Sequence, residues 1–150
     1  MRLKQHAARM KTLAAMRELQ RLRTEADAMK AAASLRARET ALDEARLARD
    51  GDAGAWLEAV STEALRPEIA SLWSQRLLTR EAEVRVAARD AKVAERERDR
   101  RNADHHAATL RRDTADGLSR AAWNEFARAR DDRALQDALD IHASKGRKGR

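Results

Sequence analysis

The stretch "ARDGDAGAWLEAV", residues 48–60, interrupts a chain that otherwise has the composition of long, charged helices. It contains two of the five glycines, Gly51 and Gly54, and the first of the three tryptophans, Trp56. A short connection that contains glycine most often joins two antiparallel helices. We therefore interpret "RDGDAGAW" as the turn of a helical hairpin and not as a linker between two modules.

The overall composition favours a coiled coil over a compact globule. Charged residues make up 38% of the 150 residues, mean hydropathy is −0.80, and there is one Pro, one Phe and no Tyr. Ala and Arg are abundant, which is typical of long helices. The chain has no cysteine, no apolar signal-peptide core and no apolar run long enough to span a membrane. We expect one helical domain, residues 1–144, in a cytoplasmic protein.

The first fifty residues have a helical period. A set of apolar residues recurs at spacings of three and four residues, which is the pattern of a coiled-coil seam: Leu19, Leu22, Ala26, Met29 and Ala33. Ala8, Thr12 and Ala15 extend this pattern weakly toward the N-terminus. Beyond Ala33 the phase slips, and Leu35, Leu42 and Ala45 continue on a shifted stripe. We expect a helix over about residues 2–50, followed by a turn over about residues 51–62.

The second helix is expected to begin near residue 66 and to end near residue 140. Pro67 suits the first turn of a helix and disfavours helical angles at Arg66. Beyond it, one stripe is interrupted by Arg80 and Arg98 and otherwise consists of Ala70, Trp73, Leu77, Val84, Ala87, Ala91 and Ala94. The last residues, 145–150, are "KGRKGR", which we interpret as a basic, flexible tail; contact with acidic lipid or nucleic acid stays an alternative for it.

Neither helix can bury its narrow apolar stripe alone, so each needs the other for stability. The sequence predicts an all-α fold, an elongated antiparallel two-helix coiled-coil hairpin with a longer second helix. Folding at residues 51–62 pairs residues 2–50 with about 64–112 and leaves some thirty C-terminal residues unpaired. This overhang contains Trp123 and Phe126, and an amphipathic helix without an internal partner suggests an external one.

Catalytic, cofactor and metal sites are not expected. "DGDAG" begins like a calcium loop, but Ala55 and Ser61 stand where such a loop needs glycine and glutamate. His105 and His106 are adjacent, so on a helix they point about 100° apart and do not chelate one ion. No phosphate loop or nucleophile elbow is present. We expect a protein that is not an enzyme.

The net charge of +7 raises the question of nucleic acid as a partner. Most arginines, however, alternate with acidic residues, as in "REAEVRVAARDAKVAERERDRR", residues 80–101. This alternation is typical of a solvated helix rich in ion pairs and not of a surface that follows phosphates. The pattern therefore disfavours nucleic acid.

The layout of an early helix, a turn near a Trp, a longer second helix and the ending "NEFARAR", residues 124–130, resembles the FliJ family. Its members are flagellar type III export proteins, related to the YscO-type stalk proteins of virulence secretion. The resemblance implies a non-enzymatic stalk that contacts a hexameric export ATPase, a membrane export gate and export chaperones. It also implies a cytoplasmic protein that is peripheral to the inner face of the cell membrane through these partners.

The resemblance implies two sets of site residues. The spacing of the family's gate-binding surface on the second helix is matched by Leu65, Ile69, Leu72 and Arg76. On the first helix the family uses aromatic residues, in whose place this chain offers Leu42, Ala45 and Leu47. The ATPase-binding set is expected in the overhang, at Trp123, Asn124, Glu125, Phe126, Arg128 and Arg130.

Other interpretations stay open at this point. Leu65, Ile69 and Leu72 fit the core of the hairpin as well as they fit a binding surface. The whole chain also fits a homo-oligomeric cytoplasmic coiled-coil scaffold, or, as a third interpretation, a basic helical protein associated with nucleic acid.

Overall fold

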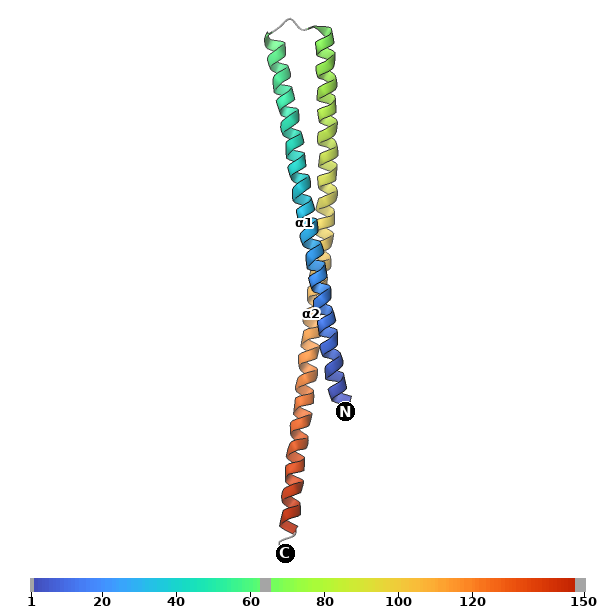
Figure 1. Ribbon diagram of the computed structural model, residues 1–150, viewed down its shortest axis with the longest axis vertical. Coiled ribbons are helices and arrows are strands. Elements are labelled where there is room, and N and C mark those ends of the chain that lie inside the picture. Colours follow the sequence, from blue (N-terminus) through green and yellow to red (C-terminus); the bar gives the residue numbers. More distant parts are fainter. Residues whose placement is uncertain (1, 63–65, 148–150) are drawn as a thin grey trace. The chain divides into compact units, whose positions relative to one another are not determined.

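The computed structural model describes residues 2–62 and 66–147, which form two helices and no strand (Figure 1). Helix α1 comprises Arg2–Thr62 and helix α2 comprises Pro67–Arg147. The predicted all-α hairpin with a longer second helix is confirmed. Over these described residues, neither helix contains a stretch that is long and apolar enough to cross a membrane.

Helix α1 continues through Gly51 and Gly54, so the predicted turn at residues 51–62 is wrong. Neither glycine adopts a positive φ, which a glycine turn would use. A glycine inside a helix costs about 1 kcal/mol relative to alanine. This cost is offset because Asp52 and Trp56, on the same helical turns, contact α2.

The start of α2 at Pro67 agrees with the prediction. Arg66 is not helical, and its carbonyl oxygen accepts a hydrogen bond of 3.0 Å from the amide of Ala70. Glu68 in the first turn places a negative charge beside the positive end of the helix dipole. At its other end α2 extends beyond residue 140 to Arg147, so residues 145–147 of the predicted flexible tail are helical. Residues 148–150 lie outside the described part of the chain.

The hairpin divides into two compact units. The terminal unit combines α1 up to Thr24 with α2 from His105 onward, and the turn unit combines α1 from Glu25 with α2 up to Asp104. Within each unit the helices are antiparallel, because partner numbers on α2 fall as those on α1 rise. The cross-helix contacts that establish this are Thr24–His105 and Glu18–Arg112 in the terminal unit, and Arg38–Asp90, Arg49–Glu81 and Trp56–Trp73 in the turn unit.

In the turn unit, each helix presents a strict heptad repeat to the other. On α1 the repeat contains Ala28, Ala31, Leu35, Arg38, Leu42, Ala45, Arg49, Asp52 and Trp56, all buried or partly buried except Arg38. On α2 it contains Trp73, Leu77, Arg80, Val84, Ala87, Ala91, Ala94, Arg98 and Arg101, all buried or partly buried. The stripe predicted for residues 70–94 of the second helix is therefore confirmed.

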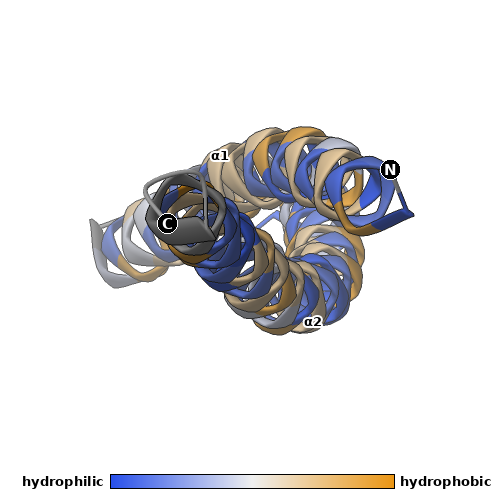
Figure 2. Ribbon diagram, turned by 90° about the horizontal axis from the view of Figure 1, so that it is seen from below, coloured by the Kyte–Doolittle hydropathy of each residue, from blue (hydrophilic) through white to orange (hydrophobic). Residues whose placement is uncertain are grey.

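In the terminal unit, the same repeat continues, with alanine at six of its positions. On α1 it contains Leu3, Ala7, Met10, Ala14, Arg17, Arg21 and Thr24; on α2 it contains His105, Ala108, Arg112, Ala115, Ser119, Ala122, Phe126 and Ala129. Hydrophobic and hydrophilic residues alternate along both ribbons (Figure 2). Since alanine buries little apolar area, the aliphatic stems of the arginines complete the seam.

The seam predicted for the first helix is wrong up to Ala33, whereas Leu35, Leu42 and Ala45, predicted on a shifted stripe, do lie in the observed seam. Leu19 and Met29 expose 68% and 65% of their surface, and Leu22, Ala26 and Ala33 are exposed as well. Over residues 12–33, the stripe that contacts α2 consists of alanines, arginines and a threonine and has no large apolar residue, whereas the exposed stripe has three. A count of apolar residues therefore selects the wrong face.

The predicted register is wrong too. Pairing residues 2–50 with 64–112 would place the start of α1 opposite Arg112, whereas Arg112 forms an ion pair of 3.1 Å with Glu18. The start of α1 lies instead beside Phe126, which lines one groove with Leu3. Trp123 and Phe126 therefore face α1 and do not belong to an overhang, as the sequence had suggested.

Replacing the two glycines of α1 tests the correction of the turn. A Cβ atom built at Gly51, Gly54 or Gly117 meets nothing within 4 Å. We expect Gly51→Ala and Gly54→Ala each to stabilise the hairpin by about 1 kcal/mol and to raise its melting temperature by circular dichroism. Gly117→Ala, inside α2, is the matched reference and should have a similar effect. Destabilisation by the first two variants alone would show that residues 51–54 form a turn.

Candidate functional site

Asp52 is the polar centre of the turn unit. It is only 8% exposed, although it carries a charge. Arg76 donates to its carboxylate from Nε at 2.8 Å and from Nη2 at 2.7 Å, and Arg80 donates from Nε at 2.8 Å. These hydrogen bonds from Arg76, and then those from Arg80, lower the pKa of Asp52 to about 2. The cluster is therefore charged and fully paired at neutral pH.

An aromatic pair lies beside this cluster. The ring centroids of Trp56 on α1 and Trp73 on α2 are 6.1 Å apart, with the planes tilted by 39°. The guanidinium of Arg76 lies over the Trp73 ring, 5.4 Å from its centroid. Arg76 thus contacts the carboxylate and the ring at once, which holds the two helices together next to their connection.

The residues expected to bind the export gate separate into two groups. Ile69 and Leu72 are 38% and 66% exposed, so they present apolar area on the first turns of α2. Arg76 is committed to Asp52 and Trp73, although its side chain remains 56% exposed. Leu65 lies outside the described residues. Of the four residues predicted on α2, only Ile69 and Leu72 therefore form a candidate binding surface within the described part of the chain.

On α1, the residues expected to contribute to the surface that binds the export gate are not all exposed. Leu42 and Ala45 are partly buried in the seam, while Leu47 is 73% exposed. Leu57 and Val60, which lie between Trp56 and the end of α1, are 65% and 41% exposed. The sequence analysis missed them because it placed them in a turn, although their helical spacing from Trp56 was available as a signal.

A groove in the terminal unit forms the second candidate surface. It has a volume of about 580 Å³ and lies where α1 begins beside α2. Its apolar lining is Leu3, Phe126, Ala129 and Ala134, and its charged lining is Arg2, Lys4, Arg130, Arg133 and Asp137. Four cations against one carboxylate make this groove basic around an apolar floor. Only two of its residues, Phe126 and Arg130, belong to the ATPase-binding set expected from the sequence.

The other members of that set lie around the groove. Trp123, 39% exposed, packs edge-on against Phe126 with the ring centroids 5.6 Å apart, and it lines a neighbouring hollow with Lys11. Asn124, Glu125 and Arg128 are exposed and do not line the groove. The structure therefore brings Trp123, Phe126 and Arg130 together.

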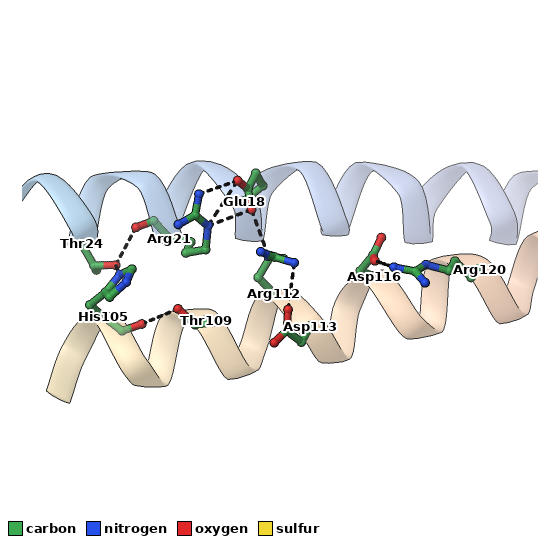
Figure 3. Close-up of polar contacts among 9 residues, drawn as sticks. All are labelled: Glu18, Arg21, Thr24, His105, Thr109, Arg112, Asp113, Asp116 and Arg120. Carbon is green, nitrogen blue, oxygen red and sulfur yellow. Dashed lines mark hydrogen bonds and ion pairs between the residues drawn. The ribbon is translucent and has the colours of Figure 1, made fainter. Parts of the chain in front are cut away.

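Between the apolar layers of the terminal unit lies a polar section of the seam (Figure 3). Glu18 on α1 accepts hydrogen bonds from Arg21 and forms an ion pair with Arg112 of α2. The hydrogen bond from Arg21 is the main cause of a lowered pKa at Glu18. Thr24 lies 3.5 Å from Nδ1 of His105. The contacts Glu18–Arg112 and Thr24–His105 link the two helices in a section of the seam where alanines alone would provide little stabilisation.

The described residues contain no group of three or more His, Cys, Asp or Glu side chains placed to hold a metal ion. His105 and His106 have their ring centroids 6.2 Å apart, and His105 faces Thr24 in the seam.

Comparisons with known proteins give no relative. No family model, no curated protein and no solved structure matches the chain. The two surfaces described above therefore carry the functional argument.

Acidification tests the role of Asp52. Its pKa in the folded protein lies below the usual 3.8, so its contribution to stability is present above about pH 4 and is lost as the pH falls toward 2. We expect Asp52→Asn to lower the melting temperature at pH 7 by several degrees and to flatten the decrease between pH 4 and pH 2. Asp90→Asn, which removes an exposed 3.5 Å ion pair with Arg38, is the control and should melt like the unaltered protein. An unchanged pH profile in Asp52→Asn would contradict this role.

Proposed function

We propose that the protein is a non-enzymatic stalk of a bacterial flagellar or type III protein export apparatus. In this role a coiled-coil hairpin links a hexameric export ATPase to the membrane export gate and assists export chaperones. The observation that carries the proposal is the basic groove of the terminal unit, which combines an apolar floor with four cationic side chains.

The groove is suited to an acidic protein partner. Phe126 supplies aromatic area of the kind that commonly dominates binding energy, and Arg130 and Arg133 stand beside it. Arginine binds carboxylates through several directed donors. We propose that acidic loops lining the centre of the ATPase hexamer contact this groove, with Trp123 packed behind Phe126.

The turn unit supplies the proposed contact with the export gate. Ile69 and Leu72 near the start of α2, together with Leu57 and Val60 near the end of α1, expose apolar side chains on both helices. The cluster of Asp52, Arg76 and Arg80 holds the helices that carry them. Arg76 acts in this proposal as a support for the surface and not as its central contact.

The proposed stalk is cytoplasmic and reaches the inner face of the cell membrane through the export gate. The second candidate function, a homo-oligomeric coiled-coil scaffold, is favoured by a separate observation, the exposed apolar stripe that contains Leu19 and Met29 on α1. The exposed acidic residues that alternate with arginine along α2 disfavour the third candidate, association with nucleic acid.

The charge of the groove provides the test of the stalk function. We expect Arg130→Glu/Arg133→Glu to lower stimulation of a cognate export ATPase by about tenfold or more, because two cations at the groove become like charges to an acidic partner. The matched control is Arg85→Glu/Arg89→Glu, which makes the same charge change at exposed positions of the turn unit. Stimulation is measured as the rate of ATP hydrolysis, with helicity followed by circular dichroism. Full stimulation by the groove variant would refute the proposed contact.

A further inference from the structure

A hollow between the two helices of the terminal unit is separate from the basic groove. It has a volume of about 600 Å³, which is within the range of sites that bind small organic molecules. None of its lining residues lines the basic groove. We call it the Ser119 hollow. Apart from two alanines of α1, its lining consists of Lys11, Glu18, Arg112, Asp116, Ser119 and Trp123.

Ser119 is a buried polar residue at a seam position where its neighbours are alanines. It is 8% exposed, and the repeat on α2 places it between Ala115 and Ala122. Its hydroxyl makes no hydrogen bond within the described residues, whereas the hydroxyl of Thr114 donates to the carbonyl oxygen of Leu110. Burying a hydroxyl without a partner costs free energy that an alanine at the same position would avoid. The Ser119 hydroxyl is therefore available to a group from outside the chain.

Lys11 lies opposite Ser119 in the register of the two helices. Glu18 and Arg112 form an ion pair of 3.1 Å across the seam. One heptad back on α1 and one heptad forward on α2 lead from this pair to Lys11 and Ser119. Lys11 is exposed and forms no ion pair within the described residues. Its ammonium and the Ser119 hydroxyl can therefore bind the same small group.

The other charges that line the Ser119 hollow are neutralised by ion pairs (Figure 3). The carboxylate of Glu18 pairs with Arg112, and the carboxylate of Asp116 pairs with Arg120 one turn along α2. Lys11 therefore supplies the unpaired charge of the described lining. A single unpaired cation favours a ligand group with one negative charge.

Trp123 adds an aromatic surface beside these two polar groups. It follows Ser119 by four residues, so the two side chains lie on the same face of α2, one turn apart. It is 39% exposed although it packs edge-on against Phe126. The exposed part of a tryptophan ring packs well against another aromatic ring. The apolar part of the ligand is therefore expected to be aromatic.

We propose that the Ser119 hollow binds an aromatic carboxylate. The ammonium of Lys11 pairs with the carboxylate, the hydroxyl of Ser119 donates a hydrogen bond to it, and the aromatic ring packs on Trp123. A free small molecule and the C-terminal aromatic residue of a peptide share this chemistry. The site is independent of the proposed stalk function, because Lys11 and Ser119 do not line the basic groove.

Titration of the isotope-labelled full chain with phenylacetate, followed by NMR, tests the proposal. We expect saturable shifts of the Trp123 indole N–H and of the amides of Lys11 and Ser119. Phenylethanol, which has the ring without the carboxylate, should give no saturable shift. Equal binding of the two compounds, or no saturable shift at these residues with phenylacetate at millimolar concentration, would overturn the proposal.

A comparison of phenylacetate with the acetylated dipeptide glycylphenylalanine distinguishes the two sources of the carboxylate. Tighter binding of the dipeptide would support the C-terminus of a peptide as the ligand. Tighter binding of phenylacetate would support a free small molecule. Either result supports a site for an aromatic carboxylate, and binding of neither compound would overturn it.

Two variants connect binding with the named side chains. We expect Lys11→Met and Ser119→Ala each to weaken phenylacetate binding by about tenfold. The matched controls are Lys30→Met and Ser34→Ala, which make the same changes at exposed positions of the turn unit and should leave binding unchanged. Ser119→Ala should also raise the melting temperature, because it removes an unpaired hydroxyl and favours the helix. Unchanged binding by Lys11→Met or by Ser119→Ala would overturn the proposal.

Discussion

The register of the two helices depends on a few polar contacts across a seam of small residues. Alanines such as Ala28, Ala31 and Ala91 recur at buried positions of the seam, so apolar contacts alone specify the register weakly. The carboxylate of Asp52 fits only where Arg76 and Arg80 both reach it. Leaving a buried carboxylate without a partner is costly, which excludes the shifted registers. A polar residue in a seam that specifies register at the expense of stability is a known feature of coiled coils.

The scarcity of large apolar residues in the seam is accompanied by exposed apolar residues elsewhere on the two helices, which are available for contacts with partners. Alanine occupies many positions of the seam between α1 and α2, while larger apolar residues such as Leu19, Leu72 and Met29 remain exposed. At the groove of the terminal unit, the large seam residues Leu3 and Phe126 are bordered by cationic side chains. The hairpin therefore exposes several surfaces, and these surfaces differ from one another in charge.

The fold class could be predicted from the sequence because period and composition determine it, but the pairing could not. The stripe on α2 was predicted correctly because Trp73, Leu77 and Val84 make it more apolar than its surroundings. Over residues 12–33 of α1 the most apolar stripe faces outward, so the same reasoning selects the wrong side there, whereas Leu35, Leu42 and Ala45 were placed on the correct stripe. Gly51 was taken as part of a turn because its cost in a helix is visible in the sequence, whereas the offsetting contacts of the neighbouring residue 52 with α2 are not.

The errors in the turn and in the register also explain why the predicted site residues differ from those that the structure brings together. A register set by the wrong turn placed Trp123 and Phe126 beyond the end of α1, so the sequence indicated an exposed overhang where the structure has a groove shared by both helices. The cationic residues Arg2 and Lys4 were missed because they are distant in sequence from Arg130. Ile69 and Leu72 were selected by matching the spacing of the FliJ-family gate surface, which does not depend on the register of the hairpin, and they are exposed.

The pairing of α1 with α2 in the terminal unit is tested most directly by intramolecular disulfide formation. Ala7 and Ala122 are 0% and 7% exposed and lie in the seam between the contacts of Leu3 and of Glu18 with α2. Because the chain has no native cysteine, the double variant Ala7→Cys/Ala122→Cys reports this pairing alone. We predict rapid oxidation to a cross-linked monomer, and no cross-link in Ala7→Cys/Ala107→Cys, which matches the register expected from the sequence. Cross-linking of the second pair and not of the first would contradict the account.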